Sequence, residues 1–297
     1  MPTPEPRLRI VSDLHFAEHG SRLRHLRSLE PLFDGVQKVV FNGDTIETRF
    51  LDLDPLCVER KDEFLDFASR HSEQLILVTE NHDPDLSEIH HLDLDNGEVL
   101  ITHGDTLFPD LAPWGWEARY FRRELERLLA LEPAETRETF EARLRVCKLA
   151  VMSMRDLSPR YPGPSSHPWE RRFRFILSIR RVDRIIGSWR QTPSVTAALA
   201  EKYRPRAKVV IAGHVHRPGV WRVRGRWAIN TGSLVPPMGA VMVDFVGREL
   251  QLRRWRIRKD LAEIGPVFFR IHLDSPPPPR SKLKDPASSQ KPLTYVS

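Results

Sequence analysis

A short apolar run followed at once by a polar motif recurs along this chain and constrains its fold more than any other feature. Runs of this length, rich in Val, Ile and Leu, are typical of strands buried on both faces of a sheet. In open α/β sheets, polar residues at the carboxyl ends of such strands face a shared crevice. The pattern therefore predicts an α/β protein with its site at the strand ends. The runs are Arg9–Ser12, Val39–Phe41, Leu75–Val78, Val99–Thr102 and Lys208–Ala212, and the motifs are Asp13-Leu14-His15, Asn42-Gly43-Asp44, Asn81-His82-Asp83, His103-Gly104-Asp105 and Gly213-His214-Val215-His216.

The remaining segments complete this α/β organisation. Arg22–Leu32 and Asp62–His71 are predicted to be helices between the strands. We expect one domain over residues 6–270, interrupted by a helical insertion over 108–206 and followed by a disordered Pro-rich tail over 275–297. Further apolar runs predict strands of a second sheet at Gly219–Val223, Arg226–Ile229, Val241–Phe245 and Leu250–Ile257.

Within the insertion, the apolar spacing changes to that of helices. Thr192 and Pro193 are a suitable cap and first-turn pair for a last helix that ends near Tyr203. Ser158–Pro168 is rich in Pro and Ser and is predicted to be an irregular loop. Two apolar helix faces are predicted, one of Phe121, Leu125, Leu128 and Leu129 and one of Phe140, Leu144, Cys147 and Val151.

Composition and charge narrow the class of protein. The 297 residues carry a net charge of +6, which favours an anionic partner. The two cysteines, Cys57 and Cys147, are too few for a disulfide framework, and we expect both to be buried packing residues. No apolar run reaches the roughly 18 to 20 residues that span a bilayer, and the first residues lack a signal-peptide pattern. We therefore expect a cytoplasmic protein.

Together the polar motifs supply the donor atoms of a site for two divalent ions. Carboxylate, amide and imidazole donors favour Mn, Fe, Zn, Co or Ni over Ca or a lone Mg. Two such ions about 3.5 to 4 Å apart can activate water and neutralise phosphoryl oxygens. Each motif alone is more often a turn, a cap or a structural histidine, but five motifs in this order, each after a strand, favour the metal interpretation. The candidate ligands are Asp13, His15, Asp44, Asn81, His103, His214 and His216.

These five motifs, in this order and spacing, resemble the signature of the calcineurin-like metallophosphoesterases. The resemblance covers roughly residues 9–245 apart from the insertion, and it implies two mixed β-sheets packed as a sandwich with helices outside. It also implies that two divalent ions are bound, Mn being the first expectation, and that Asp44 bridges them. His82 is then expected to protonate the leaving oxygen or to stabilise the transition state, with Asp83 orienting it. One ion is expected on Asp13, His15, Asp44 and His216, and the other on Asp44, Asn81, His103 and His214.

Two positions depart from the family pattern. Glu80 stands where the family usually has Gly before the Asn-His-Asp triplet, and Glu47 stands where it usually has Asp. Neither departure removes a candidate ligand. A glycine would permit positive φ, so we expect Glu80 to alter the turn that places Asn81.

The insertion suggests a substrate. His103–Leu107, together with a helical insertion before the last histidine motif, resembles the UDP-2,3-diacylglucosamine pyrophosphohydrolases, whose insertion acts as a lid over acyl chains. Those enzymes usually carry Arg where His82 stands, and their insertion is shorter. Basic and aromatic residues over Trp169–Arg190 suit an anionic membrane surface or amphiphile, a packed lid helix, or single-stranded nucleic acid.

These indications predict a phosphoesterase that hydrolyses a phosphodiester or pyrophosphate bond, with a nucleotide-linked lipid such as a UDP-linked acyl sugar as candidate substrate. We expect it in the cytoplasm, including the inner face of the membrane. A nuclease or cyclic-nucleotide phosphodiesterase is an alternative enzyme. An interaction scaffold without turnover is the alternative from another class.

Overall fold

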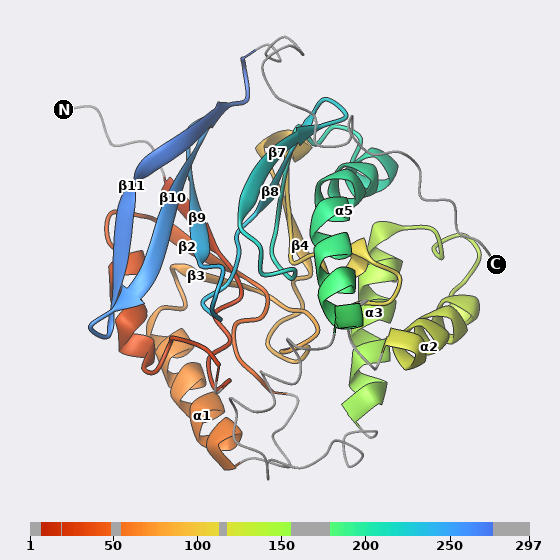
Figure 1. Ribbon diagram of the computed structural model, residues 1–297, viewed down its shortest axis with the longest axis horizontal. Coiled ribbons are helices and arrows are strands. Elements are labelled where there is room, and N and C mark those ends of the chain that lie inside the picture. The colour runs from red at the N-terminus through yellow and green to blue at the C-terminus, as the bar shows by residue number, and fades with distance from the viewer. Residues whose placement is uncertain (1–6, 19, 49–54, 113–117, 156–178, 276–297) are drawn as a thin grey trace.

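Two mixed β-sheets face each other at the centre of the molecule (Figure 1). The computed structural model describes residues 7–18, 20–48, 55–112, 118–155 and 179–275. The six-stranded sheet has the order β11-β10-β9-β1-β2-β3, with β1 to β3 parallel and the other pairs antiparallel. Its strands are β1 (Arg7–Val11), β2 (Lys38–Asn42), β3 (Leu75–Val78), β9 (Ala240–Val246), β10 (Glu249–Arg258) and β11 (Leu261–His272).

The second sheet has five strands in the order β4-β5-β6-β8-β7, and its central strands β5, β6 and β8 are parallel. Its strands are β4 (His91–Leu94), β5 (Val99–Thr102), β6 (Val209–Ala212), β7 (Gly219–Val223) and β8 (Arg226–Asn230). The predicted sandwich of two mixed sheets is therefore confirmed. β4 and β11 were not predicted. The assignment of Val241–Phe245 and Leu250–Ile257 to a second sheet is wrong, because β9 pairs with β1 and β10 pairs with β9 in the six-stranded sheet.

The alternation of side chains along the strands builds the apolar layers. Val40 of β2 faces the layer between the two sheets, whereas its neighbours Val39 and Phe41 face the outer layer. On β5, Leu100 likewise points outward, away from the layer between the sheets. Because successive side chains of a strand point to opposite faces, runs that are apolar throughout are buried on both sides. The strand ends are thereby held at fixed positions relative to one another.

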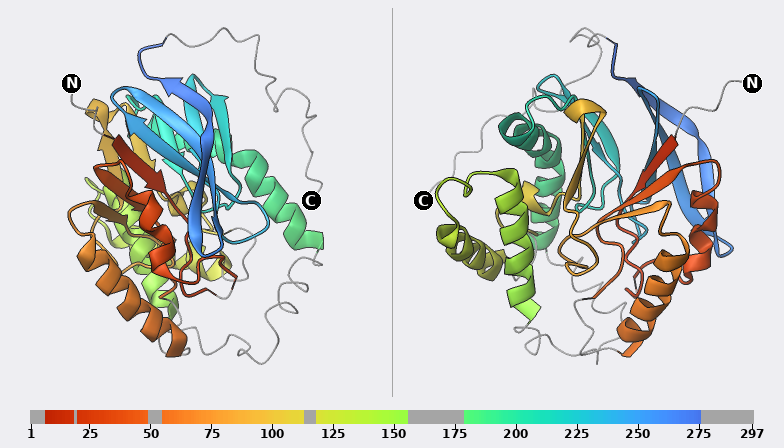
Figure 2. Two further views of the ribbon diagram at one scale, coloured as in Figure 1. Left: turned by 90° about the vertical axis from the view of Figure 1, so that its left-hand side faces the viewer. Right: turned by 180° about the vertical axis from the view of Figure 1, so that it is seen from behind.

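Helices cover the outer faces of both sheets (Figure 2). α1 (Pro55–Arg70) and the 3₁₀ helix η1 (Leu26–Leu32) pack on the six-stranded sheet, and α3 (Phe140–Arg155) and α5 (Ile179–Tyr203) pack on the five-stranded sheet. α2 (Ala118–Leu131) packs against α3. Short 3₁₀ helices η2 (Asp95–Gly97) and η3 (Asp105–Leu107) flank β5. Within the described residues, no helix combines the length and apolar character needed to cross a membrane.

The helical predictions hold in part. Segment 62–71 lies almost wholly in α1, but the helix predicted from Arg22 is only η1, which begins at Leu26 and contains Pro31. Cys57 and Cys147 are both buried, as predicted, and do not form a disulfide with each other. Segment 158–168, the first ten residues of 169–190 and residues 276–297 lie outside the described residues. The proposed domain boundaries stay a prediction.

The predicted helix start at Thr192 and Pro193 is wrong, because α5 runs through both residues. Proline lacks the N–H that would bond the carbonyl four residues earlier. Here that carbonyl belongs to Trp189, and the Nη1 atom of Arg217 donates to it at 3.3 Å. Thr192 Oγ1 donates back to the Ser188 carbonyl at 2.7 Å instead of capping a helix. A partner from outside the helix thus satisfies the carbonyl that the proline leaves open.

Candidate metal centre

The strand ends bring the polar motifs together between the two sheets. Asp13 follows β1, Asp44 follows β2, His103 follows β5 and His214 follows β6, each within two residues of the strand. Backbone hydrogen bonds join the loops: Asp13 N donates to the Gly43 carbonyl at 3.0 Å, and His15 N donates to the Asp44 carbonyl at 2.8 Å. The loops are therefore fixed to one another as well as to their strands.

One group of possible ligand atoms comprises Asp13, His15, Asp44 and His216, whose atoms all lie within 4.8 Å of one another. The Nε2 atoms of His15 and His216 are 2.9 Å apart. Asp44 Oδ2 is 3.2 Å from His15 Nε2, and Asp13 Oδ1 is 3.3 Å from His216 Nε2. Two imidazole nitrogens and two carboxylates thus converge on one point, an arrangement that suits a transition-metal ion.

A second group comprises Asp44, His103 and His214, again within 4.8 Å of one another. Asp44 belongs to both groups, as a bridging carboxylate must. Asn81 N–H is directed to the Glu80 carboxylate, whereas Asn81 Oδ1 is buried and accepts no hydrogen bond from the described residues. Six of the seven candidate ligands, all except Asn81, therefore lie in two groups that share Asp44. Their role as ligands remains a proposal.

Hydrogen bonds behind the imidazoles fix which nitrogen each ring presents. His103 Nδ1 lies 2.9 Å from the Asn42 carbonyl, and His214 Nε2 lies 2.8 Å from the Leu111 carbonyl. A ring nitrogen that donates to a carbonyl leaves the other nitrogen unprotonated and able to bind a metal. His15 Nδ1 lies at ion-pair distance, 3.0 Å, from a carboxylate oxygen of Glu18, without the geometry of a hydrogen bond. Glu18 was not predicted, although its position three residues after His15 is a usable signal.

Backbone strain is concentrated at this site. Asp13, His15, Asp44, His214 and His216 all have positive φ, between 48° and 70°. L-residues other than glycine rarely adopt this left-handed conformation, and its cost persists only where the surrounding structure holds it. The strain supports a functional role for these strand ends, because a purely structural turn could use glycine.

The residues present fit a pair of divalent ions. Within the described residues, Asp44 Oδ1, Asn81 Oδ1 and His103 Nε2 are buried without a hydrogen-bond partner. Buried polar atoms in folded proteins nearly always have a partner. The three open atoms belong to three of the four ligands predicted for the second ion.

The electrostatics of the site agree with this fit. Burial lowers the pKa of His103, but the Asp44 carboxylate raises it to about 10. Burial opposes ionisation of Asp44, yet the nearby imidazoles of His82, His103 and His15 hold its pKa well below its ordinary value. Carboxylates that attract protons to buried imidazoles attract divalent cations in the same way.

His82 is oriented by Glu47 and not by Asp83. The Nδ1 atom of His82 is 2.7 Å from Glu47 Oε2, and the ring is 16% exposed, with Nε2 3.9 Å from Asp44 Oδ1. Asp83 instead accepts hydrogen bonds from the N–H groups of Thr45 and Ile46, so its predicted orienting role is wrong. The departure at Glu47 was visible in the sequence, but its contact with His82 was not.

Glu80 folds its side chain into the site. It is not among the residues with positive φ, so the turn forms without the conformation that a glycine would permit. Its carboxylate accepts hydrogen bonds from Asp44 N at 3.1 Å and His82 N at 2.7 Å. Glu80 therefore adds a buried carboxylate beside Asn81, and its effect on the placement of Asn81 stays a prediction.

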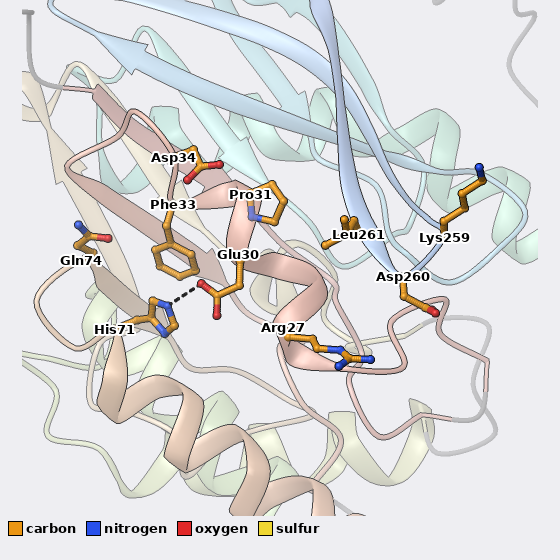
Figure 3. Close-up of a pocket in the computed structure, with 10 residues that line it drawn as sticks. All are labelled: Arg27, Glu30, Pro31, Phe33, Asp34, His71, Gln74, Lys259, Asp260 and Leu261. Carbon is orange, nitrogen blue, oxygen red and sulfur yellow. Dashed lines mark hydrogen bonds and ion pairs between the residues drawn. The ribbon is translucent and has the colours of Figure 1, made fainter.

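A surface pocket of about 810 Å³ shares no residue with this site (Figure 3). Its floor includes the Phe33 ring, on which His71 stacks with ring centroids 4.4 Å apart. His71 also pairs with Glu30 at 3.2 Å. The lining mixes both charge signs, so it favours no single ligand. It consists of Arg27, Glu30, Pro31, Phe33, Asp34, His71, Gln74, Lys259, Asp260 and Leu261.

No protein-family model matches the chain, and no curated protein matches its sequence. Solved structures with similar folds include vacuolar protein sorting 29 from Cryptosporidium parvum, with 11% identity, TM-score 0.43 and coverage of 91% of this chain and 100% of the other. A dimetal phosphatase from Danio rerio has 13% identity, TM-score 0.40 and coverage of 89% and 100%. The phosphoesterase YfcE from E. coli has 14% identity, TM-score 0.37 and coverage of 90% and 100%. Because these TM-scores are below 0.5, the functional interpretation rests on the site residues.

Proposed function

We propose that this protein is a phosphoesterase that uses two divalent metal ions to hydrolyse a phosphodiester or pyrophosphate bond. The observation that carries the proposal is the shared carboxylate: Asp44 belongs to two adjacent groups of possible ligands, in which buried donor atoms lack partners. Asp13, His15, Asp44 and His216 would hold one ion, and Asp44, Asn81, His103 and His214 the other. When bound, such ions activate water and neutralise the charge on phosphoryl oxygens.

The protein residues then orient the ester and move a proton. His82 is partly exposed beside both ligand groups, with Nδ1 held by Glu47 at 2.7 Å. A ring fixed through Nδ1 directs Nε2 toward the substrate side, where the protonated imidazole can donate to the leaving oxygen. The Glu47 carboxylate stabilises the charged ring, in the way that a buried carboxylate orients the histidine of a hydrolytic triad.

Contacts of the insertion with the last histidine motif support a role for it in substrate selection. The loop after β5 reaches His214 through the Leu111 carbonyl, and the Trp189 indole on α5 donates to the Val215 carbonyl at 2.8 Å. The Arg217 guanidinium lies 5.8 Å from the ring centroids of both Trp189 and Trp221. An arginine framed by two tryptophans beside the site suits a substrate with an anionic group and an aromatic or apolar part. A UDP-linked acyl sugar has this chemistry and is the substrate we propose to test first.

The deciding experiment combines elemental analysis of the purified protein with Mn²⁺-dependent hydrolysis of bis-p-nitrophenyl phosphate and of a UDP-linked diacyl sugar. We expect about two transition-metal ions per chain and hydrolysis of both compounds. Cleavage of bis-p-nitrophenyl phosphate alone supports phosphoesterase activity and contradicts the acyl-sugar substrate. Cyclic nucleotides and single-stranded nucleic acid are then the next substrates to test. Protein that binds no metal and cleaves none of these esters contradicts the proposal and favours an interaction scaffold.

A further inference from the structure

The carboxylate of Glu80 is buried beside an imidazole, and no lysine or arginine of the described residues balances its charge. Its residue is 2% exposed, and within the described residues it forms no ion pair with Lys or Arg. The Nε2 atom of His103 is 3.4 Å from Glu80 Oε2. Burying an ionised carboxylate is costly unless a counter-charge or several hydrogen bonds compensate.

Hydrogen bonds fix the orientation of Glu80 within the site. Oε1 accepts from the N–H groups of Asp44 and His82, and Oε2 accepts from the N–H group of Asn81. Gly43 leaves room for the side chain, since a Cβ at that position would lie 2.4 Å from Glu80 Cγ. The backbone therefore holds this carboxylate against His103 and Asp44 in one position.

The Glu80 oxygen lies where a ligand of the second ion is needed. His103 Nε2 is buried without a hydrogen-bond partner, and two carboxylate oxygens flank it: Glu80 Oε2 at 3.4 Å and Asp44 Oδ2 at 3.5 Å. Donor atoms bound to one ion at about 2.1 Å are separated by roughly 3 to 3.5 Å. The spacing of these three atoms matches ligands that share one ion better than it matches hydrogen bonds among themselves.

We propose that Glu80 is an additional ligand of the ion held by Asp44, Asn81, His103 and His214. The inference rests on the proposed two-metal function and adds a second carboxylate to one of the two sites. A second carboxylate strengthens the binding of a divalent cation, and with Glu80 this ion has five proposed protein ligands where the other ion has four. We therefore expect the two ions to bind with different affinities, the tighter one at the site that contains Glu80.

The test is a calorimetric titration of the metal-free full-length protein with Mn²⁺, comparing the unaltered protein with Glu80→Gln. Glutamine keeps the size of the side chain and removes its charge. We expect two binding events in the unaltered protein, and in Glu80→Gln a loss of at least about tenfold in affinity for one event with the other unchanged. Unchanged affinity for both events, or an equal loss in both, overturns the ligand role.

Asp105→Asn is the matched control. Asp105 is also a buried carboxylate next to His103 in the sequence motif, but its oxygens accept from Thr106 N and from the Cys147 thiol. This variant removes a negative charge from the same region without removing the proposed ligand, so we expect a smaller loss of affinity than in Glu80→Gln. An equal loss in both variants shows a general charge effect and contradicts ligation by Glu80.

A second variant covers the case in which Glu80→Gln does not fold. Glu80→Asp keeps the charge but shortens the side chain by one methylene, so a ligand is lost while the charge remains. Weakened binding of one ion supports ligation, and full affinity overturns it. Failure of the unaltered protein to bind any metal would count against the proposed function itself, and is thereby distinguished from failure of the Glu80 inference.

Discussion

Asp244 and Asp44 are both buried carboxylates, yet the protein neutralises them in different ways. Asp244 lies on β9 directly opposite Arg9 of β1. Its two oxygens are 2.7 and 3.1 Å from Nε and Nη2 of Arg9, and Arg253 Nε is 3.3 Å away. This is a bidentate ion pair, completed when the strands pair.

Asp44 has no such partner. Within the described residues its ion pairs are with histidines only, and its Oδ1 atom accepts no hydrogen bond. Its φ of 48° is strained, whereas Asp244 lies in regular strand. The difference teaches how to separate two kinds of buried charge. A buried carboxylate that pairs with an arginine of the same chain, as Asp244 does, stabilises the fold. A buried carboxylate without such a partner, as Asp44 is, is a candidate ligand for a cation from solution.

The largest effect is expected from Asp44→Ala, which removes the carboxylate common to both ligand groups. Metal content should fall from about two ions per chain to fewer than one, and hydrolysis should be lost. Elemental analysis after dialysis against trace metal measures this. Asp244→Asn is the control and should keep both ions. Full metal occupancy in Asp44→Ala contradicts the bridging role.

The variant His82→Ala tests whether His82 acts in proton transfer or in metal binding. We expect turnover to fall by about 10² to 10⁴ while metal content stays nearly intact, because His82 is proposed to donate a proton and not to ligate. Glu47→Gln should lower turnover less, since the ring remains but loses its anionic partner. Steady-state kinetics with bis-p-nitrophenyl phosphate, together with elemental analysis, provide the measurements. Loss of both ions in His82→Ala would show that the assigned role is wrong.

Asp244→Asn tests the other member of the comparison. Arg9 is 4% exposed, so the variant leaves a buried guanidinium without its carboxylate. Breaking a buried pair in this way costs about 3 to 5 kcal/mol. Denaturant unfolding of the metal-free proteins measures the difference, with Glu263→Gln as a control at an exposed ion pair that should change little. A free energy of unfolding equal to that of the unaltered protein would show that the Arg9–Asp244 pair does not stabilise the fold.

The sequence predicts that Asp13, Asp44, His103 and His214 lie near one another, because each follows a strand that is apolar throughout. Once β1, β2, β5 and β6 are buried on both faces, their carboxyl ends must meet, and Asp13, Asp44, His103 and His214 meet with them. Burial of a strand follows from its local pattern, so it can be inferred without the tertiary structure, whereas the order of strands cannot: β9 and β10 join the sheet of β1 and not the predicted second sheet.

Contacts between loops are not predictable in the same way. Glu47 reaches His82 across 35 positions of the chain, and only the packing of the two loops shows that Glu47, not Asp83, holds the ring. The continuity of α5 through Pro193 depends likewise on Arg217, which lies outside the helix. Local propensity correctly treats proline as a helix start, but a distant donor satisfies the carbonyl that proline leaves open.

The smallest effect, a dependence on pH, distinguishes the two buried carboxylates without any substitution. In the metal-free protein the pKa of His103 is about 10, above its ordinary value of 6.5, because Asp44 attracts the proton. A pKa raised by folding stabilises the folded state below the ordinary value, and that stabilisation is lost as pH rises toward 10.

The melting temperature of the metal-free protein should therefore fall by roughly a few degrees between pH 7 and pH 9.5. Saturation with Mn²⁺ should abolish much of this fall, because the cation replaces the proton as the counter-charge of Asp44. Mn²⁺ binding at pH 7 should accordingly release about one proton or more, measurable by calorimetry in buffers with different ionisation enthalpies. Two results together would contradict this account: Mn²⁺ binding without proton release, and a melting temperature that does not change with pH. They would mean that the metal does not replace a proton on His103 and that groups of the chain balance the charge of Asp44, as they balance that of Asp244.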